Sequence, residues 1–402
     1  MILATATASM FMTLPGQTAG IAVFLEQIIA DLTLQRTTVS LLYLIGTLIA
    51  AFTLTLVGWA IDRYGPRRAA SGIVILFICG CLVMSSATGP LSLLLGLILV
   101  RAFGQGALPL VSMHSVNLWF IRNRGMAVGI AGLGIALGTA AFPPLIELMM
   151  GNYGWRTTYA MLGGLIALVV LPLVVTFFRD HPESYGLLPD GDTVTSRREN
   201  EHRADDTGSE PALTLPQAQR TATYWLFVLG GVAVSCFGTA LVFHHYAIMT
   251  ANGVDRTVAA LMFVPFGIAM ATSNLLTGLA MDRLAPRYLL SFNLALLVTA
   301  LACASRVDSP ALVIAYGVGI GALQGMHGAL QAGVYAHYFG RRHLGVVRGF
   351  ASTLSVGGSA AGPFLFALGF DLFDDQVTTL VVATAVPLVI AVTAPFLKPV
   401  RA

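Results

Sequence analysis

The chain has 402 residues, of which 56% are hydrophobic and only 10% are charged. A soluble globular domain carries about 25% charged residues, so this composition excludes an ordinary soluble protein and indicates a chain built for hydrocarbon. The formal net charge is +3, and nearly all of the charged residues lie between apolar runs. That placement favours a role in membrane topology over nucleic-acid binding.

Apolar segments follow one another along the whole chain. A helix needs about 20 apolar residues to cross a hydrocarbon core of about 30 Å. The sequence therefore predicts an all-α membrane protein with two six-helix halves, residues 1–178 and 219–402, joined by a polar cytoplasmic linker at residues 179–218. The twelve predicted spans are residues 5–30, 38–61, 67–88, 91–119, 125–149, 155–178, 221–249, 257–281, 286–304, 309–338, 345–370 and 376–398.

The arginines predict the orientation of these spans. One side of the predicted membrane has only Arg36, Arg156, Arg256 and Arg306, and the other side has the remaining loop arginines. By the positive-inside rule the arginine-rich side is cytoplasmic, which places both termini and the linker there. The N-terminus lacks the basic region of a cleavable signal peptide, so we expect the first span to direct insertion into the cell (inner) membrane.

A charged turn occurs twice in the chain. Gly58 to Arg68 reads GWAIDRYGPRR, and Gly278 to Arg287 reads GLAMDRLAPR, so each has Gly, Asp-Arg four residues later, and then Pro-Arg. An Asp at a helix end can pair with a neighbouring helix terminus or an arginine, and such contacts must break when that side of a membrane protein opens. The alternative is that these charges set topology alone. We interpret the following residues as gate residues: Asp62, Arg63, Arg67, Asp282, Arg283 and Arg287.

These features together resemble the major facilitator superfamily. Arg101 to Gly106 (RAFGQG) resembles the arginine-containing motif of its fourth helix, and the glycines and prolines of the fifth span resemble another of its motifs. The resemblance covers essentially the whole chain. It implies a twelve-helix secondary transporter that works by alternating access, as a monomer and without a cofactor or a metal.

A narrower resemblance concerns two connecting segments. Arg179 to Gly191 (RDHPESYGLLPDG) and Trp119 to Ala127 (WFIRNRGMA) resemble the monocarboxylate and oxalate:formate transporter branch. Those relatives place a basic residue in helix eight, and the oxalate carriers add a lysine in helix eleven. Here Phe263 to Thr277 carries no charge and span eleven has no lysine, so the sequence departs from the branch where its substrate would bind.

Polar residues inside spans are the candidate substrate ligands, because a charge in the bilayer centre is costly and marks function by default. The planar guanidinium of Arg101 suits a carboxylate, although it could also hold helix four to neighbouring backbone carbonyls. Proline and glycine within Leu14 to Gly20 predict an interruption of the first span. Helices one, four, seven and ten line the cavity of the superfamily, and the resemblance, with one residue added from span eight, selects Gln17, Thr18, Arg101, Gln105, Asn274, Gln324 and His327.

Titratable groups near the spans are candidates for proton coupling. A buried glutamate can take up a proton, and histidine titrates near physiological pH. The alternatives are interfacial glutamates that reach water and histidines that are hydrogen-bonded between helices. The candidates are Glu26, Glu147, His244, His245 and His327.

The sequence therefore predicts a secondary active transporter of a small organic anion, a monocarboxylate, with proton coupling or exchange as its driving force. Its partners are the solute, protons and the lipid bilayer, with no nucleic acid. Two alternatives stay open: a proton-driven exporter of drugs or metabolites, and a membrane sensor that does not transport. An enzyme is not expected, since the sequence has no nucleotide loop, metal cluster or Ser-His-Asp spacing. The solute, the direction of transport and the coupling ion stay open.

Overall fold

The computed structural model describes residues 1–120, 123–180, 213–340 and 343–396, and the regular elements in these ranges are helices. In this part of the chain, eleven helices are long and apolar enough to cross a membrane. One of them, Arg124–Phe177 (α7), has 54 residues and is broken at Gly154, where φ is 73° and ψ is 167°. An unbroken helix of that length would measure about 80 Å, so α7 contains two spans. The prediction of an all-α protein with twelve spans is confirmed.

The chain forms two compact units. The first consists of Met1–Ile21, Ile45–Phe142 and Leu148–Ser209, and the second of Ala22–Leu44, Pro143–Glu147 and Glu210–Ala402. The division of the sequence into halves at residues 178 and 219 stays a prediction. Residues 181–212 of the predicted linker lie outside the described residues.

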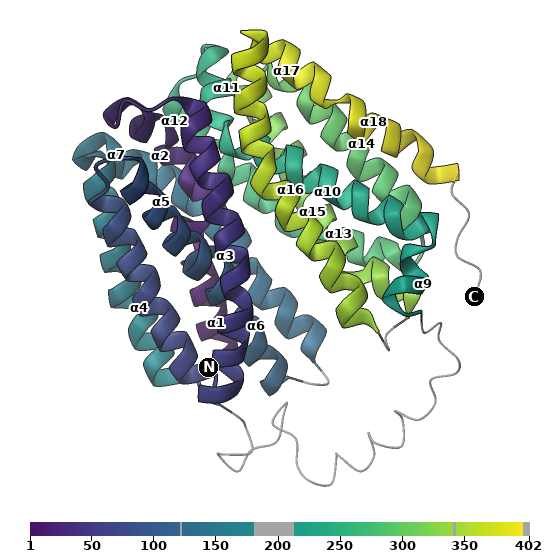
Figure 1. Ribbon diagram of the computed structural model, residues 1–402, viewed down its shortest axis with the longest axis horizontal. Helices are drawn as coiled ribbons and strands as arrows, with labels where there is room; N and C mark the ends of the chain where they lie inside the picture. The colour runs from purple at the N-terminus through teal and green to yellow at the C-terminus, as the bar shows by residue number, and fades with distance from the viewer. Residues whose placement is uncertain (121–122, 181–212, 341–342, 397–402) are drawn as a thin grey trace. The chain divides into compact units, whose positions relative to one another are not determined.

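The first unit is a bundle in which α4 packs against α5 and α1 against α6 (Figure 1). Pro15 and Gly16 interrupt the first span, as the sequence predicts, because proline has no backbone N–H and glycine weakens a helix. The elements are Ile2–Phe11 (α1), a 3₁₀ turn at Leu14–Gly16, the start of Thr18–Asp31 (α2), most of Arg36–Tyr64 (α3), Pro66–Ser85 (α4), Pro90–Leu99 (α5), a π-helical segment at Val100–Ala107, Leu108–Trp119 (α6) and most of α7.

In the second unit, α13 packs against α15 and α10 against α16 (Figure 1). Aspartates that cap helices lie in its loops: hydrogen bonds from the backbone N–H and side chain of Thr257 lower the pKa of Asp255, and those from Thr378 lower that of Asp375. The elements are the rest of α2, the start of α3, Pro143–Glu147 of α7, Leu215–Gln219 (α9), Ala222–Phe243 (α10), His245–Ala251 (α11), Arg256–Leu261 (α12), Phe263–Met281 (α13), Pro286–Ala304 (α14), Pro310–Phe339 (α15), Leu344–Phe373 (α16), Gln376–Ala383 (α17), Ala385–Thr393 (α18) and a 3₁₀ turn at Ala394–Phe396.

Two spans are much more buried than the others. The most apolar windows of Ile2–Asp31 and Ala222–Phe243 are both 78% buried, whereas those of the remaining spans are 28% to 50% buried. These two are the first and the seventh of the predicted spans, which occupy equivalent positions in a chain made of two repeats. Most residues of these two windows therefore face protein.

Glycines allow the close contacts between helices. On α15, a Cβ at Gly321 would overlap the carbonyl oxygen of Phe266 in α13, and one at Gly325 would overlap that of Met270. On α16, a Cβ at Gly362 would overlap the carbonyl oxygen of Cys236 in α10. Small residues of this kind let helices approach in a membrane, where packing contacts replace the hydrophobic effect.

We expect Gly321→Ala to lower the free energy of unfolding by about 1–3 kcal/mol, because the added methyl group forces α13 and α15 apart. Gly319→Ala on the same helix is the control, since a Cβ there meets open space. Thermal unfolding of the purified proteins in detergent measures both variants. Equal melting temperatures for the two would contradict the close contact.

Candidate functional site

Arg101 lies beside the interruption of the first span. Its side chain belongs to the π-helical segment, and the residue is only 2% exposed. One nitrogen, Nη1, donates to the carbonyl oxygen of Gly16 at 3.4 Å and to the hydroxyl of Thr18 at 3.3 Å, and Nε donates to the hydroxyl of Thr47 at 3.0 Å. Three of its contacts are thus with neutral oxygen atoms.

Two facing glycines bring these groups together. A Cβ at Gly16 would overlap the carbonyl oxygen of Val100, and a Cβ at Gly104 would lie 3.1 Å from the Cα of Gly16. The 3₁₀ turn and the π-helical segment can therefore touch along their backbones. A π-helical turn inside an α-helix often marks a functional site, and here it carries Arg101.

The other two sequence candidates of the first unit lie next to this contact. The amide nitrogen of Gln17 donates to the hydroxyl of Thr13 at 3.3 Å. Gln105 follows Gly104, and its Oε1 is buried without a partner among the described residues. An unpaired buried acceptor is costly, so a bound group that donates a hydrogen bond would be favoured there.

A seam of polar and small residues joins α15 to α10 in the second unit. Gln324, His327 and Gln331 lie within about 60° of arc on α15. The Nε2 of His327 lies 3.2 Å from the hydroxyl oxygen of Ser235 on α10. A Cβ at Gly238 would lie 3.2 Å from the amide nitrogen of Gln324, and one at Gly231 would overlap that of Gln331. We call these six residues the α10–α15 seam; none of its members is charged when His327 is neutral.

Asn274 lies between two other helices. Its amide nitrogen donates to the carbonyl oxygen of Gly325 at 3.1 Å and thereby links α13 to α15. A side chain with this bond contributes to helix packing, where polar groups act across the interface.

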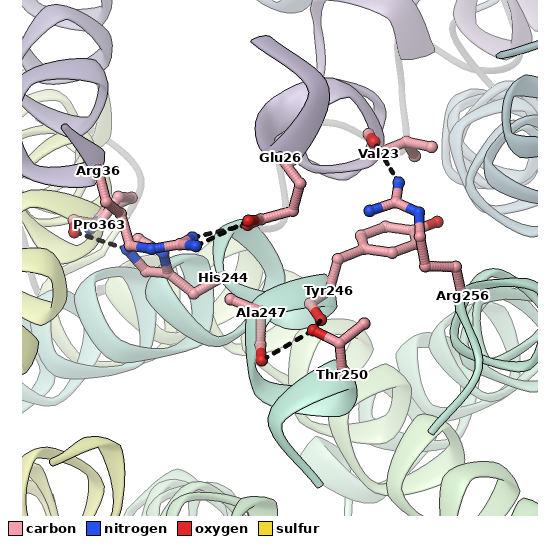
Figure 2. Close-up of polar contacts among 9 residues, drawn as sticks. All are labelled: Val23, Glu26, Arg36, His244, Tyr246, Ala247, Thr250, Arg256 and Pro363. Carbon is pink, nitrogen blue, oxygen red and sulfur yellow. Dashed lines mark hydrogen bonds and ion pairs between the residues drawn. The ribbon is translucent and has the colours of Figure 1, made fainter. Parts of the chain in front are cut away.

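Both glutamates singled out in the sequence are paired with arginines in the second unit. Arg36 donates two hydrogen bonds to Glu26, at 2.7 and 2.8 Å (Figure 2). Arg256 donates two to Glu147, at 2.9 and 3.0 Å. Such bidentate pairs are the strong, geometrically specific kind of ion pair. In this structure neither glutamate is simply an interfacial acid that reaches water.

Arg256 makes two further contacts. Its Nη2 donates to the carbonyl oxygen of Val23 at 3.1 Å, and its guanidinium carbon lies 4.8 Å from the centre of the Tyr246 ring (Figure 2). A cation over an aromatic face is attracted by the ring's charge distribution. Val23 and Glu147 precede the predicted linker and Arg256 follows it, so Arg256 ties two parts of the sequence together.

His244 and His245 are fully buried and hydrogen-bonded to backbone. His244 Nε2 lies 2.8 Å from the carbonyl oxygen of Pro363, and His245 Nε2 lies 2.9 Å from that of Ala259. A carbonyl only accepts, so each Nε2 carries a proton and donates. Each Nδ1 is buried without a partner among the described residues, which suits the neutral ring.

The first charged turn is held by a residue that sequence reasoning missed. Asp180 accepts a hydrogen bond from the backbone N–H of Arg67 at 3.1 Å, and the Nε of Arg67 donates to the carbonyl oxygen of Val175 at 2.9 Å. Gly65 has a φ of 80°, and a Cβ there would overlap the Asp180 carboxylate. Two separate features therefore require glycine at position 65: the positive φ and the space that the Asp180 carboxylate occupies. Asp180 in turn caps the start of α4.

The remaining gate candidates are exposed or stacked on aromatic rings. Asp62, Asp282 and Arg283 are exposed. The guanidinium carbon of Arg63 lies 5.3 Å from the ring centre of Trp59, and that of Arg287 lies 4.9 Å from the ring centre of Tyr288. The roles of all these residues in gating stay predictions.

Comparison with known proteins gives the family. The family model of the Major Facilitator Superfamily matches residues 1–363. The chain therefore belongs to the Major Facilitator Superfamily, as its sequence motifs predict. It is a multi-pass membrane protein of this transporter class and not an enzyme.

Individual relatives are more distant. The chain is 26% identical over 186 residues to a probable sulfoacetate transporter of Cupriavidus necator, and this match covers 46% of the chain and 41% of that protein. It is 30% identical over 103 residues to monocarboxylate transporter 13 of Bos taurus, covering 26% of the chain and 24% of the relative. It is 35% identical over 128 residues to a multidrug resistance protein B homologue of Mycobacterium tuberculosis, covering 31% and 23%. These matches thus span less than half of each relative.

Solved structures agree on the fold. A D-xylose-proton symporter superposes with a TM-score of 0.72 at 14% identity, over 99% of this chain and 98% of the symporter. A bacterial homologue of the lysosomal transporter Spinster gives 0.66 at 17% identity, over 98% and 94%. At such identities the likeness concerns the fold alone.

We expect Arg256→Gln to lower the free energy of unfolding by about 1.5–3 kcal/mol, because a hydrogen bond to a charged group contributes that much and Glu147 loses its cation. The double variant Glu147→Gln, Arg256→Gln should lose less than the sum of the two single variants. Unfolding in detergent measures the cycle, with Arg306→Gln, an exposed arginine, as the control. Additive losses would show that the pair contributes no coupling.

Proposed function

We propose that the chain is a secondary active transporter that moves a small organic anion, a monocarboxylate, across the cell membrane by alternating access. The observation that carries the proposal is the buried guanidinium of Arg101 beside the interrupted first span, next to the hydroxyl of Thr18. A planar cation in an apolar surrounding attracts a carboxylate strongly, since the local dielectric is low. Gln17 and Gln105 would add hydrogen bonds to the bound solute.

The names of two relatives support an anionic solute. A sulfoacetate transporter and a monocarboxylate transporter both act, by name, on small organic acids. Arg101 supplies the matching positive charge. In the second unit the α10–α15 seam would supply neutral hydrogen bonds through Gln324 and His327, and Asn274 would position α15.

Among the five titratable candidates, we infer that His327 couples transport to protons. Its partner Ser235 is a hydroxyl, which can both donate and accept, so the hydrogen bond survives protonation of the ring. His244 and His245 donate to carbonyls, and Glu26 and Glu147 are paired with arginines. Protonation of either glutamate would break its ion pair. Protonation of His244 or His245 would keep the Nε2–H bond but would place a new donor at Nδ1, which is buried without a partner among the described residues.

The orientation and the gates belong to the same proposal. Both termini face the cytoplasm of a cell with this protein in its inner membrane, and the protein acts as a monomer. The charged turns that contain Asp62, Arg63, Arg67, Asp282, Arg283 and Arg287 hold the cytoplasmic side closed. The pair of Glu147 and Arg256 would close the opposite side.

One observation favours a second candidate function, export of amphiphilic compounds. An open groove of about 700 Å³ runs between α1 and α7 in the first unit, lined by Met1, Leu3, Phe11, Ile130 and Leu137 among other apolar residues. Such a surface suits an apolar solute, and one relative is named as a multidrug resistance protein. Arg101 would then be a structural residue.

Uptake into proteoliposomes distinguishes the two functions. The panel contains labelled monocarboxylates, sulfoacetate, dicarboxylates and lipophilic cations, each with and without an inward proton gradient. Saturable carboxylate or sulfonate uptake supports the anion carrier. Gradient-driven movement of lipophilic cations alone would support export and contradict the anion carrier.

We expect Arg101→Lys to raise the KM for the anion about tenfold or more, because lysine keeps the charge but loses the planar fork, and a hydrogen bond to a charged group contributes about 1.5–3 kcal/mol. Arg101→Gln should abolish saturable uptake. Arg220→Gln, an exposed arginine, is the control. Melting temperatures show whether each variant is folded, and an unchanged KM in folded Arg101→Gln would refute the anchor.

We expect His327→Gln to keep anion binding but to lose stimulation of uptake by an inward proton gradient, because the amide can still bond Ser235 and cannot titrate. The matched control is Ser235→Ala, which removes the partner and leaves the titrating ring. Uptake rates between pH 5 and pH 8 measure both. Retained pH dependence in His327→Gln would remove His327 from the proton pathway.

A further inference from the structure

A second groove lies on the first unit, between α3 and α4. Its volume is about 440 Å³, and residues between Thr53 and Tyr64 of α3, residues between Arg68 and Leu76 of α4, and Phe103 line it. Leu56 and Leu76 are 68% and 43% exposed although both are apolar. Gly72 also lines the groove, and a Cβ at this residue would meet open space. None of the functions proposed above uses this surface.

The groove is amphipathic along its length. Arg68 and Tyr64 lie at the end where α3 turns into α4, and the rest of the lining is apolar apart from Thr53. Asp62 is the nearby acid on α3, and at 100° per residue it lies about 180° around the helix from Thr53, away from the groove. Asp180 is engaged by the backbone of Arg67. Among the described residues near this turn there are three arginines, Arg63, Arg67 and Arg68, and two acids, Asp62 and Asp180, so the groove end carries a net positive charge.

The dimensions fit one leaflet of a bilayer. Arg68 and Leu76 are eight residues apart, which is about 12 Å along α4. Half of a hydrocarbon core of about 30 Å is about 15 Å. An acyl chain that starts at Arg68 would therefore lie in the groove for most of the depth of its leaflet.

We propose that the α3–α4 groove binds an anionic phospholipid, with its phosphate at Arg68 and one acyl chain along Ala60, Ile73 and Leu76. In a bilayer the hydrophobic effect does not favour one lipid over another in this groove, because any lipid tail covers the apolar surface equally well. Selection among lipids comes from the headgroup charge, and an arginine near the membrane surface favours an anionic lipid about fivefold. The same residue next to the turn of Asp62 and Arg63 would let membrane composition influence that turn.

Native mass spectrometry of the purified, delipidated full chain tests the proposal. The protein is titrated with phosphatidylglycerol and with phosphatidylcholine of identical acyl chains. We expect the wild-type protein to prefer phosphatidylglycerol about fivefold, and Arg68→Gln to lose this preference. Gly72→Leu should lower the occupancy of both lipids several-fold, because its side chain fills the groove. Glycerol 3-phosphate, which has no acyl chains, should not compete.

Two control variants make the result decisive. Gly58→Leu introduces the same side chain into open space on α3, and at 100° per residue it lies about 140° from Thr53, outside the groove. Arg220→Gln removes an exposed arginine elsewhere. Equal lipid occupancy in Gly72→Leu and Gly58→Leu, or an unchanged headgroup preference in Arg68→Gln, would overturn the proposal. So would a wild-type protein that binds neither lipid, which is the result expected if another protein segment covers the groove.

Discussion

A bilayer offers no hydrogen bonds, so each backbone group that a helix interruption frees must find a partner inside the protein. The interruption at Leu14–Gly16 meets this constraint with Arg101, which donates to the freed carbonyl of Gly16, and with Gly104, whose missing side chain lets the two segments touch. The same contact holds a permanent positive charge in the interior. The structural and functional interpretations of Arg101 are therefore not exclusive, because the bond that stabilises the interruption also orients the guanidinium.

In the second unit, polar side chains inside the membrane find neutral partners on a neighbouring helix. On α15, Gln324, His327 and Gln331 face α10 at places where α10 carries Gly238, Ser235 and Gly231. Long polar side chains thus lie opposite small residues, and the helices stay close without unsatisfied charge. The first unit supplies a cation and the second supplies neutral donors and acceptors.

Much of the fold could be predicted from local signals. Hydropathy located the spans, and the Pro15-Gly16 pair located the interruption, because neither signal depends on what the segment touches. The side-chain pairs that hold the candidate residues could not be predicted from the sequence. Glu26 and Arg36 are 10 residues apart, and Glu147 and Arg256 are 109 apart. Ser235 faces His327 only because of the rotation and crossing of two helices. The four arginines on the predicted outer side were the available clue, since two of them, Arg36 and Arg256, pair with the two glutamates.

The distribution of protons follows from the partners. A carboxylate in a bidentate pair with an arginine loses that ion pair when it is protonated, whereas a histidine that donates Nε2–H to a carbonyl gains a second donor at Nδ1, which here is buried without a partner among the described residues. Glu26, Glu147, His244 and His245 are of this kind. A hydroxyl partner can donate or accept a hydrogen bond, and of the five candidates only His327 has a hydroxyl partner, Ser235. A proton can bind there without loss of the local hydrogen bond, so its effect is a change of charge next to the seam. A change of charge of this kind is what the proposed coupling by His327 requires, because it would alter the electrostatic attraction for an anion while α10 and α15 keep their contact.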